Sequence, residues 1–338
     1  SRNSSPLRMA QNQSDDVEES HTNNSPSETY PETLIATLPM REGWSTPLVF
    51  YKNFWLRSPM LKDLLLAQNK FRPRHDDTIL ATNPKSGTTW LKALAFTIVN
   101  RHRYTFTNHP LLICIPQDVV PFLEIKPGGP EYVETLPSPR LISTHSPFSL
   151  LPPGISSLGC RIVYLCREPK DTFVSRWHFE RKICKDDDYP VSFNDAFDMF
   201  CEGFSPYGPF WNHNLEYWKE SLRRPKEVIF LRYEEIVSDP LEVVRKLARF
   251  LGVPFTMQEE ESRVVDQVVN FCSFESLRSL GVNRTGRVEH AGGKISIDHS
   301  SYFRKGKVGD WVNHMSKDMG EKLDLLVEDK FKGSGLEI

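Results

Sequence analysis

One stretch of the chain has the residue types and spacing of a phosphate-binding loop: Pro84-Lys85-Ser86-Gly87-Thr88-Thr89-Trp90. It follows a short apolar run at residues 78–81 and precedes a helical pattern at residues 91–96. A strand, a Gly turn and a helix N-terminus direct several backbone N–H groups and the positive end of the helix dipole toward one point. Lys85 adds a cation, and Thr88 and Thr89 add hydroxyls, so we expect this segment to bind phosphate.

The order of residues in this loop differs from the Walker A motif. That motif places Lys directly after its last Gly and has another Gly five residues earlier. Here Lys85 precedes Gly87, and residues 81–83 contain no Gly. The loop also ends in Trp90, whose indole can stack on a nucleobase. These features favour a nucleotide site that does not hydrolyse ATP.

Three further blocks follow in the sequence: Ser143-Thr144-His145-Ser146-Pro147, Cys166-Arg167-Glu168-Pro169-Lys170-Asp171 continuing to Ser175, and Tyr302 to Trp311. With the first loop, they resemble the motifs of the soluble sulfotransferases, in that family's order, and span about residues 45–335. The pattern is most similar to plant members. The resemblance implies transfer of a sulfuryl group from 3′-phosphoadenosine 5′-phosphosulfate (PAPS) to an acceptor, with release of adenosine 3′,5′-bisphosphate (PAP) and no metal.

The resemblance also implies a role for individual residues. Lys85 would bind the 5′-phosphate with the Ser86–Thr89 backbone and stabilise the leaving phosphate, and Trp90 would stack on the adenine. His145 matches the catalytic base, and its unperturbed pKa of about 6.5 suits that role near neutral pH. The cofactor contacts implied elsewhere in the chain are Arg167 and Ser175 at the 3′-phosphate, and Tyr233, Cys272, Ser273, Phe274, Leu277, Phe303, Arg304, Lys305 and Gly306.

The resemblance does not identify the acceptor. An apolar slot for a hydroxylated aromatic or terpenoid-like compound, such as a flavonoid or a steroid-like metabolite, is expected from Trp55, Phe122, Phe148, Trp177 and Phe179. Arg176 stands where similar enzymes often have an aromatic or apolar residue. Two interpretations remain open: Arg176 pairs with a carboxylate on a hydroxy acid, such as an acidic hormone precursor, or it is a solvated residue on a helix face.

The chain departs from the family pattern at two positions beside the motifs. Asn83 replaces the Tyr that many members have before Pro-Lys. Ser143 replaces the Lys that others have two residues before the catalytic His, as in many plant members. This second change leaves Lys85 as the main cation expected near the sulfuryl group. The dimerisation motif of animal members is not visible after Trp311, so we expect a monomer.

The sequence pattern around the motifs predicts the elements that position them. Apolar runs at residues 78–81, 141–144, 162–165 and 228–231 alternate with helical patterns near 58–70, 169–182, 192–203, 207–223, 240–251 and 259–269. This alternation predicts a single α/β domain whose central parallel sheet is flanked by helices on both faces. The resemblance implies the P-loop-kinase-like sulfotransferase fold. The Pro- and Gly-rich residues 107–139 are expected to form long loops that could wall a substrate pocket.

Composition places limits on partners and location. The first 28 residues form a polar segment expected to be disordered, followed by a sulfotransferase domain at residues 29–338. A net charge of −2 argues against bulk electrostatic binding of nucleic acid. The six cysteines show no CxxC pairing, which indicates free thiols in a reducing compartment, here the cytoplasm. No apolar run is long enough to span a membrane.

Two alternative functions are considered beside the leading one. A P-loop nucleotide kinase or NTPase is disfavoured by the residue order of the loop and by the lack of a clear acidic motif for Mg²⁺. A nucleotide-binding protein of the same fold without turnover is disfavoured because Lys85, His145 and Arg167 are all present.

Overall fold

The computed structural model describes residues 30–184, 189–290 and 295–338, so the polar segment at residues 1–28 lies outside the described residues. Its central sheet has four parallel strands in the order β5-β4-β6-β7. These strands are β4 Thr78–Thr82, β5 Leu141–Thr144, β6 Arg161–Cys166 and β7 Val228–Arg232. All five residues of β4 are buried, as expected for a strand covered on both faces. The predicted parallel α/β sheet is confirmed.

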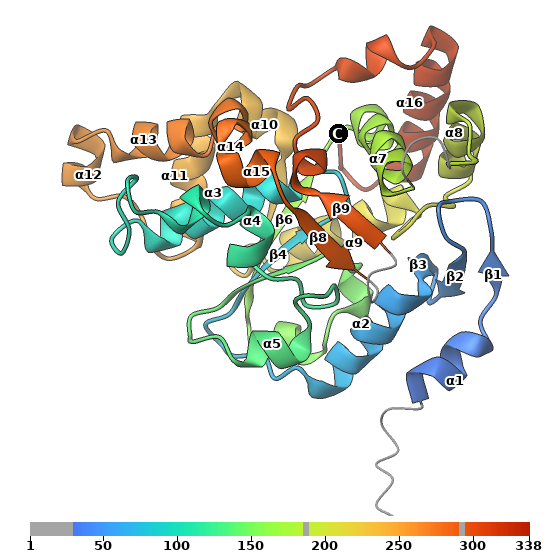
Figure 1. Ribbon diagram of the computed structural model, residues 1–338, viewed down its shortest axis with the longest axis horizontal. Coiled ribbons are helices and arrows are strands. Elements are labelled where there is room, and N and C mark those ends of the chain that lie inside the picture. Colours follow the sequence, from blue (N-terminus) through green and yellow to red (C-terminus); the bar gives the residue numbers. More distant parts are fainter. Residues whose placement is uncertain (1–29, 185–188, 291–294) are drawn as a thin grey trace, which may run out of the picture.

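Side chains that alternate along the strands form two separate cores. Leu80 and Val163 point toward helices α3, α11 and α13 on one face. Ile79 and Tyr164 point toward α2 and α9 on the other, where Tyr164 stacks on Tyr217 with 4.2 Å between ring centroids. Figure 1 shows α3, α11 and α13 grouped on one side of the molecule, and α7, α8 and α16 grouped on another.

Local sequence signals explain where the principal helices begin. Gly87 precedes α3 with a φ of 106°, and Pro169 starts α7, whose N-cap Glu168 accepts a hydrogen bond from the N–H of Asp171. The bounds of the helices are α1 Tyr30–Ala36, α2 Ser58–Lys70, α3 Thr88–Asn100, α4 Pro116–Val119, α5 Pro130–Glu134, α6 Gly154–Ser157, α7 Pro169–Ile183, α8 Phe193–Cys201, α9 Phe210–Arg223, α10 Tyr233–Ser238, α11 Pro240–Phe250, α12 Met257–Glu261, α13 Val264–Phe271, α14 Phe274–Ser279, α15 Gly281–Arg284 and α16 Lys317–Phe331.

Parts of the structure differ from the sequence-based expectation or extend it. The single helix expected near residues 259–269 is wrong: Arg263 has a φ of 55°, which separates α12 from α13. The segment that precedes α2 forms a small antiparallel sheet of β1 Met40–Arg41, β2 Leu48–Tyr51 and β3 Phe54–Arg57. A hairpin of β8 Arg287–His290 and β9 Ile295–Asp298 was also not predicted. Its residues His290 and Ile295 line the cavity described below.

Candidate functional site

The predicted phosphate loop connects β4 to α3, as the sequence indicated. Both Lys85 and Gly87 have left-handed backbone conformations, with φ values of 73° and 106°. A Cβ atom at Gly87 would lie only 2.8 Å from the Tyr233 ring and 3.0 Å from the Leu165 side chain, so the turn requires glycine. The loop therefore lies against the end of the sheet, and the N-terminus of α3 faces the same cavity as Lys85.

Lys85 lies among other cations rather than beside a carboxylate. Its Nζ atom is 3.9 Å from the centroid of the Phe179 ring. Burial, together with the charges of Arg176, Arg304 and Arg167, lowers the pKa of Lys85 to about 7. Arg304 and Arg167 have carboxylate partners in Asp310 and Asp171, whereas Lys85 forms no ion pair with a described carboxylate. An anion bound beside Lys85 would compensate its charge.

His145 directly follows β5 and is fixed by the neighbouring strand. Its Nδ1 atom lies 2.9 Å from the backbone carbonyl oxygen of Thr82. A carbonyl oxygen only accepts hydrogen bonds, so Nδ1 carries the proton and Nε2 keeps its lone pair. Burial lowers the pKa of His145 to about 3, well below the unperturbed value of about 6.5 on which the sequence-based expectation relied, so the imidazole is neutral at physiological pH. The His145 ring also contacts the rings of Phe122 and Tyr207.

Two arginines from distant parts of the chain meet on the far side of the loop. Arg167, at the end of β6, donates to the carbonyl oxygen of Lys307 at 2.9 Å, and Arg304 pairs with Asp310 at 2.6 Å. The Nε atom of each arginine is buried without a partner among the described residues. Ser175 lines the same cavity. Unpaired guanidinium donors at a cavity wall suit a phosphate ligand.

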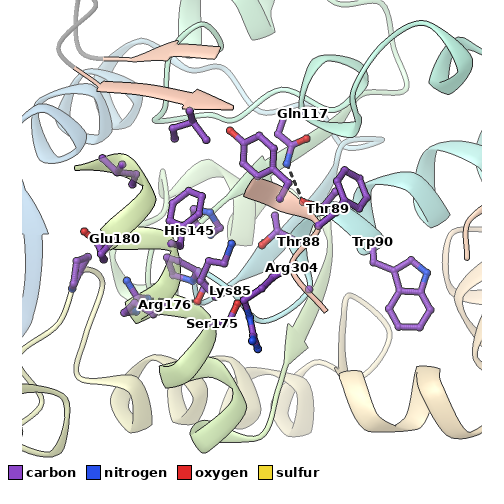
Figure 2. A pocket seen from close by; sticks show the side chains of 18 of the residues that line it. Lys85, Thr88, Thr89, Trp90, Gln117, His145, Ser175, Arg176, Glu180 and Arg304 are labelled. Carbon is purple, nitrogen blue, oxygen red and sulfur yellow. Dashed lines mark hydrogen bonds between the residues drawn. The ribbon is translucent and has the colours of Figure 1, made fainter. Parts of the chain in front are cut away.

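Most of the residues predicted from the sequence meet at one cavity. Figure 2 shows Lys85, His145 and Arg176 near its centre, with Trp90 to one side. The predicted residues that line it are Lys85, Gly87, Thr88, Thr89, Trp90, Phe122, His145, Arg167, Ser175, Arg176, Phe179, Tyr233, Phe274, Leu277, Phe303, Arg304, Lys305 and Gly306.

Six predicted residues do not line this cavity. Ser86 is buried within the loop, Cys272 is buried next to Thr97, and Ser273 caps α14. The three aromatic residues Trp55, Phe148 and Trp177 pack against Phe204, Tyr217 and Phe193 respectively. The expected apolar slot is therefore built with other side chains, among them Met60, Ile125 and Pro206.

Arg176 is buried, so its interpretation as a solvated helix-face residue is wrong. It is 2% exposed and donates to the Asn83 side chain at 3.2 Å. Its Nε atom has no partner among the described residues, and burial lowers its pKa to about 10. Nearby, Arg57 and Glu180 form an ion pair at 2.6 Å on the same cavity.

Several cavity residues carried no recognisable signal in the sequence. Arg57, Glu180, Gln117 and Tyr207 come from four separate segments and match no short motif. Gln117 donates a hydrogen bond to the Thr89 hydroxyl at 2.9 Å (Figure 2). This bond connects α4, within residues 107–139, to the phosphate loop. Only the folded structure brings these side chains to the site.

The described residues contain neither a metal-binding cluster nor a membrane-spanning helix. No group of three or more His, Cys, Asp or Glu side chains in this part of the chain could hold a metal ion. None of the helices in residues 30–184, 189–290 and 295–338 has the length and apolar character needed to cross a membrane.

Comparison with known proteins relates this geometry to a family. The sulfotransferase domain profile matches residues 75–335. The chain is 43% identical to Cytosolic sulfotransferase 15 of Arabidopsis thaliana, covering 90% of this chain and 85% of that protein. It is 45% identical to Cytosolic sulfotransferase 17 of the same plant, covering 89% and 88%. The structure of mouse sulfotransferase SULT7A1 complexed with PAP gives a TM-score of 0.65 at 27% identity, covering 85% of this chain and 95% of that one.

Proposed function

The chain belongs to the sulfotransferase family and catalyses PAPS-dependent sulfuryl transfer, and we propose that His145 and Lys85 perform this transfer to a hydroxyl group of a small organic acceptor. The observation that carries the proposal is the hydrogen bond between His145 Nδ1 and the Thr82 carbonyl oxygen. It leaves Nε2 unprotonated in a cavity that Lys85 also lines. A base and a cation on one cavity are the groups that sulfuryl transfer requires.

The donor would bind between the two cationic parts of the cavity. The N–H groups at the start of α3 would hold the 5′-phosphate, and Arg167, Ser175 and Arg304 would hold the 3′-phosphate. The unpaired Nε atoms of Arg167 and Arg304 support this assignment. Gly306 adds a close backbone approach: its φ is 65°, and a Cβ there would lie 2.3 Å from the Phe274 ring.

The reaction then follows from two side chains. The acceptor oxygen forms a bond to sulfur while the bond from sulfur to the 5′-phosphate oxygen breaks. His145 Nε2 takes the proton of the acceptor hydroxyl, and the Lys85 ammonium stabilises the charge that develops on the leaving phosphate. Removing one such charge-stabilising donor typically costs about 3–4 kcal/mol in the transition state.

We propose that the acceptor is a hydroxy acid whose carboxylate binds Arg176. The buried guanidinium of Arg176 has an unpaired Nε donor and lies on the cavity wall near the Arg57–Glu180 pair. The Tyr207 hydroxyl on the same cavity is also buried without a partner among the described residues. Two arginines against one glutamate leave an excess positive charge, which a carboxylate would balance. The other classes expected from the sequence, flavonoids and steroid-like metabolites, carry no such charge.

The remaining sequence-based expectations are also kept as proposals. We propose one domain from residue 29 to 338 and a monomer that works in the cytoplasm without membrane or nucleic-acid partners. The cytosolic names of the Arabidopsis relatives support the location. The nucleotide kinase and the inactive nucleotide-binding protein are not supported by a specific observation, because the family assignment accounts for the loop and the cavity together.

Replacing the base tests the proposed chemistry directly. We expect His145→Ala to bind PAP within threefold of the wild-type affinity in calorimetry while its turnover falls by at least tenfold. The exposed His75→Ala is the matched control and should leave both quantities unchanged. If His145→Ala keeps more than a tenth of the wild-type turnover, His145 is not the base.

A further inference from the structure

A buried carboxylate contacts the backbone of His145. Glu124 has no exposed surface, and its Oε1 atom accepts a hydrogen bond from the backbone N–H of His145 at 2.6 Å. Its Oε2 atom has no partner among the described residues. Burial raises the pKa of Glu124 to about 7, which shows that the environment disfavours its charge. A fully buried carboxylate at this position therefore needs an explanation.

A buried lysine lies close to the same place, and burial lowers its pKa well below the usual value, against the smaller raising effect of Glu124. Lys92, on α3, also has no exposed surface, and its Nζ atom is 3.4 Å from the centroid of the Phe122 ring with no hydrogen-bond partner among the described residues. Phe122 in turn contacts the His145 ring at 4.8 Å. The opposite charges of Lys92 and Glu124 act favourably on each other, although they do not form a contact ion pair.

The hydrogen bonds around His145 indicate what Glu124 does. His145 lies just beyond β5, so its backbone is no longer held by the strand ladder. Three other groups hold it instead: Glu124 accepts from its N–H, His213 Nε2 lies 2.8 Å from its carbonyl oxygen, and the Thr82 carbonyl accepts from Nδ1. Each comes from a different segment, and Nε2 is then the one hydrogen-bonding atom of His145 without a partner among the described residues.

We propose that Glu124 is a positioning residue that fixes the backbone of His145 and so aims Nε2 at the acceptor hydroxyl, and that Lys92 balances the Glu124 charge. This inference rests on the role of His145 as the base. It assigns a function to two buried charged residues that would otherwise only weaken the core, since burying unpaired ionic groups is costly. A misplacement of the base by about 1 Å can cost on the order of 100-fold in rate.

Two conservative variants distinguish positioning from a purely electrostatic role. Glu124→Gln keeps the side-chain length and an oxygen that accepts from the His145 N–H, whereas Glu124→Asp keeps the charge but shortens the reach by one methylene. We expect Glu124→Gln to keep kcat within threefold of wild type. We expect Glu124→Asp to lower kcat at least tenfold while the KM for PAPS and the PAP affinity stay within threefold. The opposite order, or no effect of either change, would overturn the proposal.

A matched control and a second background complete the test. Glu216 also accepts a hydrogen bond from a backbone N–H, that of Ser149, so Glu216→Asp should leave kcat unchanged. In a His145→Ala protein, Glu124→Asp should cause no further loss in the residual rate, because it acts through the missing base. A further tenfold loss there would show that Glu124 acts elsewhere. If the His145→Ala protein keeps its activity, His145 is not the base and the proposed function is refuted. If His145→Ala is inactive but Glu124→Asp keeps the wild-type kcat, only the positioning role of Glu124 is refuted.

Discussion

The Nδ1 atom of His145 lies 2.9 Å from the carbonyl oxygen of Thr82, the last residue of the adjacent strand β4. The next residue, Asn83, directly precedes the phosphate loop that begins at Pro84. One peptide unit therefore both fixes the tautomer of the proposed base and anchors the loop proposed to hold the donor. The central sheet therefore couples the position of the proposed base to that of the proposed donor site.

Lys85 should make donor binding depend on pH. Its lowered pKa of about 7 means that it loses its proton above neutral pH in the free protein, whereas the bound phosphate favours the protonated form. We therefore expect the affinity for PAP to weaken by about tenfold from pH 7 to pH 8.5. Calorimetry at pH 6, 7 and 8.5 measures this directly. Lys85→Arg, which keeps its charge, should flatten the profile, and an unchanged slope in this variant would contradict the assignment.

Arg304 should discriminate between nucleotides with and without a 3′-phosphate. A hydrogen bond to a charged group is worth about 1.5–3 kcal/mol, so Arg304→Met should weaken PAP binding by about 10- to 100-fold. AMP binding should not change, because AMP has no 3′-phosphate. Titration of both nucleotides into both proteins checks the prediction. Wild-type protein that binds AMP as tightly as PAP would contradict the whole donor assignment.

Arg176 should favour acceptors that carry a carboxylate. For the wild-type protein, we expect kcat/KM for a hydroxy acid to exceed that for its methyl ester by at least tenfold, since esterification removes the charge. Arg176→Met should remove most of this preference while keeping PAP affinity. Arg181→Met, on the same helix but outside the cavity lining, is the control. A ratio that is the same in wild type and Arg176→Met would show that no carboxylate binds there.

Lys92 and Glu124 should depend on each other for stability. Removing either one leaves the other charge buried without compensation, whereas removing both replaces them with neutral groups. We expect the Lys92→Met and Glu124→Gln variants each to have a lower free energy of unfolding than the wild type. The sum of these two losses should exceed the loss in the double variant by a coupling energy on the order of 1–3 kcal/mol. Urea denaturation of the four proteins gives this value, and strictly additive effects would refute the charge compensation.

The sequence predicted the parts of the site that local motifs encode. Residues within one short segment determine each of three features: the loop around Lys85, the strand before His145 and the start of α7 at Pro169. The spacing of residues within each segment was therefore sufficient to predict that feature. The sequence did not reveal Lys92, because a lysine in an apolar helical pattern is ordinarily expected at the surface. Its burial depends on Phe122, which is thirty positions away in the chain and reaches it only after folding.

The aromatic residues expected at the acceptor pocket also show that local sequence does not determine which side chains line the cavity. Trp55, Phe148 and Trp177 were expected at the acceptor pocket because of their type and their nearness to motifs. In the structure they pack against other aromatic side chains instead. Whether a large apolar side chain faces a cavity or a core depends on which helix covers it, and that information is not local.

The gathering of Lys85, Arg167, Arg176 and Arg304 around one cavity has a consequence for the lifetime of the protein. Mutual repulsion among these groups is a standing cost to the empty enzyme, and a bisphosphate nucleotide removes it. A ligand present at 100 times its dissociation constant stabilises a fold by about 2.7 kcal/mol. The fraction of enzyme that survives heat or proteolysis would thus rise with the concentration of the nucleotide that it binds.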